Sequence, residues 1–314
     1  MGRYRVLTAI RLSKSARKEL ESLGIEIIGK NTCSQADLVV VSPATPWSEV
    51  EQLLLCSGAR NLIVFGSGYD NIDLDWLKSR GICTWNLPDY ISEAVAEHAI
   101  GLALALLRNI VRGDRFVREG EWETTPAREL LGTSLVGIRA GIIGLGRVGA
   151  RIAKLLEAHG VERPILYWSR RRKVEVEHIL PLKYATLEEV FSQSKIVFIS
   201  TALSRETEGL VDRDLIALMD KGYIVNIARG KIIDEEALLW GLREGRLAGA
   251  ALDVFWAEPL QKNSPLVEFE NVILTPHIAG YTRYAMEKTM KQLVEEITRV
   301  LIEKKKPRYS LTRC

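Results

Sequence analysis

Arg229, Glu258 and His277 each come shortly after a run of apolar side chains in the last third of the sequence. An arginine guanidinium can bind a carboxylate through two parallel hydrogen bonds and polarise a neighbouring carbonyl. An imidazole titrates near neutral pH and can supply or remove a hydroxyl proton, and a carboxylate beside it orients the ring. Together the three types predict acid–base chemistry on a small carboxylic acid. Singly, each also fits a surface charge, a turn before Pro259 or a structural histidine.

Parallel strands would bring these side chains to one edge of a sheet. From Val136 onward, apolar runs alternate with helical patterns. Six strands are expected there: Ala140–Ile143, Ile165–Trp168, Ile196–Ser200, Tyr223–Ile227, Ala250–Val254 and Val272–Leu274. This alternation predicts a doubly wound sheet, which binds its ligands beyond the carboxyl ends of the strands.

The first of these strands opens into a glycine turn, Gly144-Leu145-Gly146-Arg147-Val148-Gly149. The first glycine allows the tight turn, the second allows close approach of a pyrophosphate, and the third allows helix and strand to pack closely. The helix behind the turn, Ala150–Ala158, offers unpaired amides and a positive dipole end to a phosphate. Although any tight strand-to-helix turn could show this spacing, its position after a strand and before a helix predicts a nucleotide site.

The first part of the chain repeats the alternation without a phosphate-binding turn of its own. Its expected strands are Tyr4–Ile10, Ile25–Ile28, Leu38–Val41, Leu62–Phe65 and Ile82–Trp85. Gly66-Ser67-Gly68 comes directly after the fourth of them, where an open α/β sheet binds ligands.

The two parts are joined by a stretch that predicts one long helix. It spans Ser92–Leu107, with Ser92 as a plausible N-cap. The more polar segment Arg112–Leu131, which contains Trp122 and Pro126, is expected to be a connecting excursion. The last amphipathic helix, Ala285–Glu303, could extend the second part or return to the first.

With 314 residues, of which 47% are hydrophobic and 26% charged, the chain predicts two globular domains. A net charge of +3 argues against nucleic-acid and membrane partners. The N-terminus lacks an apolar signal core, and Ala94–Leu107 is short for a bilayer span and contains Glu97 and His98. We expect no metal site, scattered reduced thiols and a cytoplasmic location, because no C-x-x-C pair or zinc spacing occurs among the cysteines, Cys33, Cys56, Cys83 and Cys314.

These motifs, in this order, resemble the D-isomer-specific 2-hydroxyacid dehydrogenase family over nearly the whole chain. The resemblance rests on Gly66–Asp73, on the glycine turn, on the segments around Arg229 and Glu258, and on Thr275–Gly280. It implies an α/β fold of two doubly wound parallel-sheet (Rossmann-like) domains with an active-site cleft between them. Residues 1–92 and 284–314 would form a discontinuous substrate domain, and residues 93–283 the dinucleotide-binding domain. The long helix from Ser92 would help to form a homodimer.

The family also implies roles for individual residues. Arg229 would bind the substrate carboxylate, His277 would be the acid/base and Glu258 its partner. The backbone amides of Ser67 and Gly68 would face the same carboxylate, and Asp253 would contact the nicotinamide carboxamide. The full set expected to bind the cofactor is Gly144, Leu145, Gly146, Arg147, Val148, Gly149, Ser169, Arg170, Arg171, Ala228 and Asp253.

The end of the second strand predicts which nicotinamide cofactor binds. Folds that select NAD place an acid there, on the ribose 2′-hydroxyl. Here Ser169 occupies that position, and the basic run Arg170–Lys173 follows. A hydroxyl and guanidinium groups can bind a 2′-phosphate, which a carboxylate would repel. The sequence therefore favours NADP(H), with NAD(H) as the alternative and a solvated charge run as the structural interpretation.

The substrate is predicted from resemblance within the family. Gly160–Tyr167, followed by Ser169-Arg170 in place of an acid, is similar to the glyoxylate/hydroxypyruvate reductase branch. The expected activity is reduction of a small 2-oxo acid to the D-2-hydroxy acid. The alternatives are an enzyme like D-3-phosphoglycerate dehydrogenase, many relatives of which carry a regulatory domain absent here, and a nucleotide-sensing corepressor that only binds.

Overall fold

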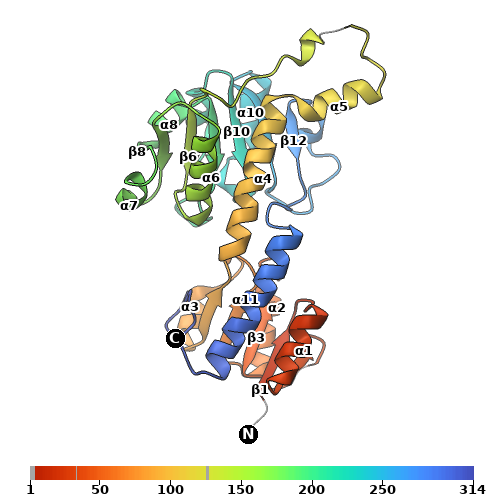
Figure 1. The fold of residues 1–314 in the computed structure, drawn as a ribbon, viewed down its shortest axis with the longest axis vertical. Helices are drawn as coiled ribbons and strands as arrows, with labels where there is room; N and C mark the ends of the chain where they lie inside the picture. Colours follow the sequence, from red (N-terminus) through yellow and green to blue (C-terminus); the bar gives the residue numbers. More distant parts are fainter. Residues whose placement is uncertain (1–3, 33, 125–126) are drawn as a thin grey trace. The chain divides into compact units, whose positions relative to one another are not determined.

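The computed structural model describes residues 4–32, 34–124 and 127–314, so Cys33 and Pro126 lie outside the described residues. The chain divides into two compact units (Figure 1). Unit 1 comprises residues 1–92 and 281–314, and unit 2 comprises residues 93–280. Each unit is built on a parallel sheet, as the fold class predicted from the sequence requires.

Unit 1 contains a five-stranded sheet in the order β2-β1-β3-β4-β5. The strands are β1 (Tyr4–Thr8), β2 (Ile25–Gly29), β3 (Leu38–Val41), β4 (Asn61–Val64) and β5 (Cys83–Asn86). Its helices are α1 (Lys14–Ser22), α2 (Trp47–Ser57), α3 (Leu74–Ser79) and α11 (Arg283–Leu301). α3 was not expected from the sequence, and the other boundaries differ from the predicted ones by a few residues.

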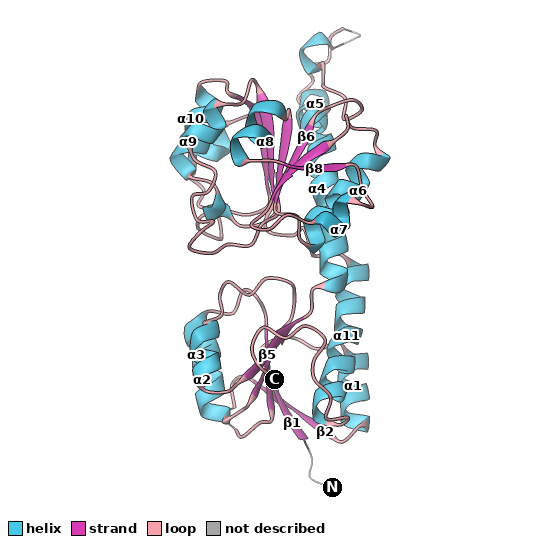
Figure 2. Ribbon diagram, turned by 90° about the vertical axis from the view of Figure 1, so that its left-hand side faces the viewer, coloured by secondary structure: helices cyan, strands magenta, loops and turns pink. Residues whose placement is uncertain are grey.

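Alternation along the strands divides the core of unit 1 between two layers of helices. Val6 and Val40 belong to the cluster that contains Leu20 of α1 and Ile297 of α11. Leu7, Val39 and Val41 belong to the opposite cluster, with side chains of α2 and α3. Figure 2 shows the two layers on either side of this sheet. Because successive residues of a strand point to opposite faces, a continuous apolar run buries both faces at once.

The last helix, α11, returns to unit 1. Leu293, Val294, Ile297 and Leu301 pack in the same cluster as the strands β1 and β3. This excludes the alternative in which the helix extends the second sheet. Unit 1 is therefore formed from both ends of the chain.

The segment that follows α11 pairs with β5, the edge strand of unit 1. Leu311 donates its amide to the Thr84 carbonyl oxygen (2.8 Å), and Thr84 donates its amide to Thr312 Oγ1 (2.8 Å). Trp85 and Ser310 form an antiparallel bridge, and a disulfide joins Cys83 to Cys314. The tail thus covers an edge whose unpaired backbone groups would otherwise be open to another chain.

The expectation of scattered reduced thiols is wrong. Cys83 and Cys314 form a disulfide, although 231 residues separate them in the sequence, and Cys56 is also disulfide-bonded. Motifs such as C-x-x-C mark only cysteines that are close in the sequence, whereas Cys83 and Cys314 meet only because α11 and the C-terminal tail return to β5. Disulfides are rare in most cytosolic proteins but common in intracellular proteins of hyperthermophiles, so they do not by themselves identify a compartment.

Unit 2 contains a seven-stranded sheet in the order β12-β11-β10-β9-β6-β7-β8. Its strands are β6 (Ala140–Ile143), β7 (Ile165–Trp168), β8 (Leu182–Tyr184), β9 (Ile196–Ile199), β10 (Gly222–Asn226), β11 (Leu247–Leu252) and β12 (Val272–Leu274). The sequence predicted six of them and missed β8, which is short and mostly exposed. The strand order reverses direction between β6 and β9, and open α/β sheets bind their ligands at such a switch point.

Helices cover both faces of this second sheet. Figure 2 shows α8, α9 and α10 on one side and α4 and α6 on the other. Phe191, Ile216 and Leu238 anchor the first group on the side chains of β9 and β10. The helices of unit 2 are α5 (Ile110–Arg118), α6 (Arg147–Ala158), α7 (Val174–Glu177), α8 (Leu187–Gln193), α9 (Arg213–Ala217) and α10 (Glu235–Arg243), with most of α4 (Asp89–Leu107).

α4 begins earlier than the sequence indicated. Its first residue is Asp89, directly after Pro88, so Ser92 is inside the helix and not its N-cap. The Ser92 hydroxyl instead donates to the Pro88 carbonyl oxygen (2.6 Å). At 19 residues, α4 has the length and composition of a bilayer span, but 56% of its apolar window is buried inside the structure, as in a core helix. α5 lies in the segment expected to be an irregular excursion.

The disulfide of the tail generates a stability prediction. We expect Cys314→Ser to lower the free energy of unfolding of unit 1 by about 2–4 kcal/mol, because the cross-link restricts the unfolded chain. Urea unfolding of the full chain without reductant measures this difference. As a control, wild type and variant should unfold alike in the presence of reductant, which removes the cross-link between Cys83 and Cys314 as well as the disulfide of Cys56. Equal stability of the oxidised wild type and the variant would contradict the prediction.

Candidate functional site

The glycine turn after β6 has the geometry of a phosphate site. Gly144 has φ +97°, and its amide donates to the Trp168 carbonyl oxygen (2.7 Å). A Cβ on Gly149 would lie 2.1 Å from the Gly144 carbonyl oxygen, so only glycine allows α6 to start this close to β6. An added Cβ on Gly146 would meet nothing within 4 Å, which leaves room for a ligand beside the backbone. No side chain caps the first turn of α6, so its amides can bind a phosphate.

The basic run after β7 is not a set of equivalent charges. Ser169 is 7% exposed and donates its hydroxyl to the Arg171 carbonyl oxygen (2.7 Å), which closes the turn. Arg170 forms an exposed ion pair with Glu206 (3.4 Å), and such pairs contribute little to stability. The Arg171 side chain is exposed and makes no hydrogen bond or ion pair with any residue that the structure describes. Arg170 and Arg171 are therefore the cations that a ligand could recruit.

Arg172 is held by a network that the sequence did not predict. It binds Glu177 through two nitrogens (2.8 to 3.1 Å), and Tyr167 donates its hydroxyl to the same carboxylate (2.6 Å). The hydrogen bond from Arg172, followed by that from Tyr167, lowers the pKa of Glu177 to about 2. Burial, followed by the bond to Glu177, raises the pKa of Tyr167 to about 12. This network holds the Arg172 side chain on Glu177 of α7, so Arg172 is less available to a ligand than Arg170 and Arg171.

The turn that carries Arg229 is shaped by Asn226, the last residue of β10. The Asn226 amide group donates to the Arg229 carbonyl oxygen (2.9 Å) and accepts from the Ala228 amide (3.1 Å). A Cβ on Gly230 would lie 2.1 Å from the Phe255 carbonyl carbon. This close approach brings the end of β10 against the segment that carries Glu258.

Glu258 and His277 form a direct pair. His277 Nδ1 lies 2.6 Å from Glu258 Oε2, and the other carboxylate oxygen accepts the Phe255 amide (3.0 Å). Burial raises the pKa of Glu258, but the hydrogen bonds and the charges of His277 and Arg229 outweigh it, so the pKa lies below its usual value. Because Nδ1 of His277 forms a hydrogen bond with the Glu258 carboxylate, the other ring nitrogen, Nε2, is left to contact a ligand.

Asp253, at the end of β11, is fully buried and ties down the loop that carries His277. Its carboxylate accepts hydrogen bonds from the Thr275 hydroxyl (2.6 Å) and from the amides of Ile278 (3.0 Å) and Ala279 (2.8 Å). Burial raises the pKa of Asp253, and these bonds together with one from His98 lower it further than burial raises it. The sequence singled out neither Thr275 nor His98 as part of the site.

In unit 1 the loop after β4 presents backbone amides. The Asn86 amide group donates to the Ser67 carbonyl oxygen (2.8 Å), and the Leu87 amide donates to the Gly66 carbonyl oxygen (2.9 Å). These two bonds fix the carbonyl groups of Gly66 and Ser67. Among the described residues, no acceptor binds the amides of Ser67 and Gly68, which leaves both available for an anion.

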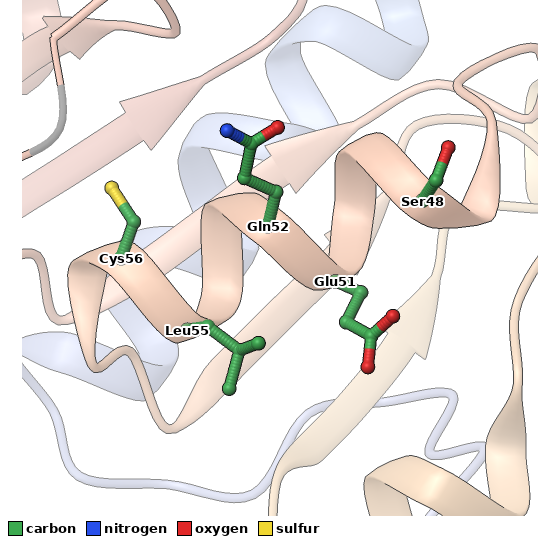
Figure 3. A pocket seen from close by; sticks show the side chains of 5 residues that line it. All are labelled: Ser48, Glu51, Gln52, Leu55 and Cys56. Atoms are coloured by element: carbon green, nitrogen blue, oxygen red, sulfur yellow. The ribbon is translucent and has the colours of Figure 1, made fainter.

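A hollow elsewhere on unit 1 shares no residue with these sites. It measures about 450 Å³ and lies along the outer face of α2, where Ser48, Glu51, Gln52, Leu55 and Cys56 line it (Figure 3). Its lining holds no group of side chains suited to acid–base work. Within the described part of the chain, no three His, Cys, Asp or Glu residues are grouped to hold a metal ion.

Unit 2 therefore combines a glycine turn at the switch point of a doubly wound sheet with an acid–base pair near the ends of later strands. This combination is typical of dinucleotide-dependent oxidoreductases. Residues 100–279 match the family described as D-isomer specific 2-hydroxyacid dehydrogenase, NAD binding domain. The chain is 43% identical over 235 residues to the glyoxylate reductase of Pyrococcus horikoshii, an alignment that covers 73% of this chain and 69% of that protein.

Solved structures give the same result. The NADPH-dependent glyoxylate/hydroxypyruvate reductase of Sinorhizobium meliloti, in complex with NADP and malonate, is similar with a TM-score of 0.85 and 29% identity, over 99% of this chain and 97% of that one. The D-lactate dehydrogenase of Aquifex aeolicus, in complex with NAD and lactic acid, is similar with a TM-score of 0.83 and 26% identity, over 96% of both chains.

The chain belongs to the D-isomer-specific 2-hydroxyacid dehydrogenase family. The resemblance inferred from its motifs is thereby confirmed. It is an oxidoreductase that uses a nicotinamide cofactor, and the matched NAD-binding domain lies within unit 2.

Proposed function

We propose that this enzyme reduces a small 2-oxo acid, glyoxylate or hydroxypyruvate, to the D-2-hydroxy acid. The observation that carries the proposal is the pair formed by His277 and Glu258 at 2.6 Å, with the charge of Arg229 close enough to lower the pKa of Glu258. The glyoxylate reductase of Pyrococcus horikoshii, at 43% identity, supports this substrate class.

Each residue has a part in that reaction. Glu258 accepts a hydrogen bond from Nδ1–H of His277 and stabilises the protonated ring. Nε2 of that ring gives its proton to the substrate oxygen while the carbonyl becomes a hydroxyl. Arg229 holds the substrate carboxylate. The family resemblance implies that the amides of Ser67 and Gly68 also bind that group. A bound nicotinamide cofactor supplies the hydride that reduces the carbonyl carbon. Release of the alcohol leaves His277 to take up a proton from water.

The cofactor set is proposed from the geometry of unit 2. The glycine turn, with Leu145, Arg147 and Val148, would hold the pyrophosphate against the first turn of α6. Ala228 would line the nicotinamide side, and Asp253 Oδ2, which accepts the Ala279 amide, has a further acceptor position for the carboxamide.

We propose that NADPH is preferred over NADH. No carboxylate follows β7 at position 169, and Ser169 closes a turn that carries two exposed arginines. The weak pair between Arg170 and Glu206 and the exposed position of Arg171 leave both guanidinium groups available for a 2′-phosphate. The NADP complex of the Sinorhizobium meliloti enzyme is consistent with this preference.

We also propose that the enzyme is a cytoplasmic homodimer, with α5, Trp122 and Leu131 at the interface. No residue of α5 is buried. Ile110 and Val117 are 56% and 55% exposed, and Trp122 and Leu131 are 58% and 87% exposed. Apolar side chains gathered in one segment mark an interaction surface, and a second copy of the chain is the occupant that the family resemblance implies.

The first prediction from the proposed function is an enzymatic activity. Purified protein with NADPH should consume the cofactor in the presence of glyoxylate or hydroxypyruvate, followed by absorbance. His277→Ala should reduce kcat at least about 100-fold with little change in NADPH affinity, because it removes only the proton donor. Absence of turnover with every 2-oxo acid in a panel would refute the proposed function, and full activity of the variant would refute the role of His277.

The second prediction concerns the cofactor. Ser169→Asp combined with Arg170→Ala should lower the ratio of kcat/KM for NADPH to that for NADH by about 100-fold, because an acid repels the 2′-phosphate and a guanidinium is lost. Steady-state kinetics with both cofactors measures the ratio. Arg172→Ala is the control, since Glu177 already holds that side chain, and it should shift the ratio far less. An unchanged ratio in the double variant would contradict the assignment.

The third prediction is the oligomeric state. Wild type should sediment as a dimer, and Ile110→Asp with Val117→Asp should convert it to a monomer, because charges at a buried interface lack solvation. Leu55→Asp, at a position on α2 that is 62% exposed, is the matched control and should remain dimeric. A monomeric wild type, or equal effects of the two changes, would contradict the interface.

A further inference from the structure

We propose that His98, on α4, is a positioning residue that holds the catalytic loop of His277 through a hydrogen-bond chain formed with Thr275 and Asp253. This inference deepens the proposed function, on which it rests. The loop meant here comprises residues 275–279, and all members of the chain belong to unit 2. His98 is not among the residues that the family resemblance assigned to the site.

The direction of the hydrogen bonds in this chain follows from its acceptor. Asp253 Oδ1 accepts the Thr275 hydroxyl proton at 2.6 Å. Because Thr275 uses its only hydroxyl proton in that hydrogen bond, its Oγ1 can only accept a hydrogen bond from His98 Nε2, which lies 3.2 Å away. Nε2 of His98 therefore carries a proton, and it also lies 3.5 Å from Asp253 Oδ1. Each bond in the chain points toward the buried carboxylate.

The same carboxylate fixes the far end of the loop. Its two oxygens accept the amides of Ile278 (3.0 Å) and Ala279 (2.8 Å), which directly follow His277. His277 itself has φ +54°, and its amide donates to the Thr275 carbonyl oxygen (3.0 Å). A left-handed conformation is unfavourable for a residue with a Cβ and persists only where its surroundings impose it. Asp253 imposes it by holding the residues on both sides of His277.

His98 matters because Asp253 has no access to water. A buried carboxylate needs hydrogen bonds to stay charged, and a charged carboxylate binds the two loop amides more strongly than a neutral acid would. His98 donates a hydrogen bond to the Thr275 hydroxyl oxygen and so orients the hydroxyl proton toward Asp253. Loss of the His98 donor would leave the threonine hydroxyl free to turn away. The loop would then be held less tightly at both ends.

If His98 had a purely structural role, its ring would only pack α4 against its neighbours and would not hold the loop. The two roles differ in what rescues the variant. Phe at position 98 keeps an aromatic ring of similar size and removes the donor. Gln loses the ring and keeps an N–H donor on a side chain of comparable reach. A positioning role requires Gln to be the better substitute, whereas a packing role requires Phe to be.

The test has one measurement that is independent of activity. Amide hydrogen exchange of the peptide covering residues 275–280 reports the bonds from Ile278 and Ala279 to Asp253. We expect His98→Phe to accelerate this exchange about tenfold, the usual scale of one hydrogen bond to a charged group, and His98→Gln to restore most of the protection. His159→Phe, on the C-terminal end of α6, is the matched histidine control and should leave the peptide unchanged.

The second measurement is kinetic. His98→Phe should lower kcat for the 2-oxo acid about tenfold with little change in the KM for NADPH, and His98→Gln should recover it. Thr275→Val removes the middle of the chain, so the double variant should be no worse than the more affected single one. If His98→Phe does not fold, as judged by circular dichroism, Thr275→Val takes its place in the exchange measurement with the same expected result.

Unchanged loop exchange in a folded His98→Phe enzyme, or equal loss in the Phe and Gln variants, would overturn the proposal. Additive effects of His98→Phe and Thr275→Val would also overturn it. Failure of the proposed function can be distinguished from failure of this proposal. If the wild type reduced no 2-oxo acid, amide hydrogen exchange would still show whether His98 holds the loop.

Discussion

The buried carboxylate of Asp253 is the constraint on which the arrangement of unit 2 depends. A charged group without access to water is destabilising unless donors surround it, and here the surrounding donors all come from the loop of His277 or from α4. Satisfying that carboxylate therefore fixes the loop, and the loop in turn sets His277 beside Glu258. The same hydrogen bonds satisfy one buried charge and fix the position of the His277 ring.

Close backbone packing supplies the second part of the arrangement. Gly230 lies against the backbone of Phe255, and Phe255 donates its amide to Glu258. The end of β10, which carries Arg229, thus lies next to the segment that holds the partner of His277. The first contact joins two backbone segments and the second joins a backbone amide to the Glu258 carboxylate, so both restrict where side chains of the proposed site can lie. Substitution of Gly230 would disturb the site through the backbone, because a Cβ there has no space.

The fold could be predicted because its signals are local. Runs such as Leu38–Val41 and Ala140–Ile143 are apolar, short and bounded by turns, and they form strands at those positions. β8 was missed because Leu182–Tyr184 buries only its first residue, so it carries no pattern of a strand buried on both faces. The disulfide between Cys83 and Cys314 was missed for the opposite reason, since both residues are conspicuous but only the return of the C-terminal tail brings them together. α5 was missed although its apolar residues recur with helical periodicity, because the segment that contains most of it was interpreted as polar as a whole.

The site shows the same division between residue type and residue environment. Arg229, Glu258 and His277 could be proposed as site residues from the sequence because their order and neighbours resemble those of a known family. The environment of each charge could not be identified in this way. Four basic residues follow Ser169, and nothing in the sequence distinguishes Arg170, Arg171 and Arg172 from one another. The structure separates them, because Glu177 holds Arg172 through charge-assisted bonds while Arg170 has only an exposed partner. A 2′-phosphate that binds at this turn competes with a weak ion pair for Arg170 and with a strong network for Arg172, and for Arg171 it competes only with water. The preference for a phosphorylated cofactor that we propose therefore depends less on the number of arginines than on which of them lack a strong partner in this fold.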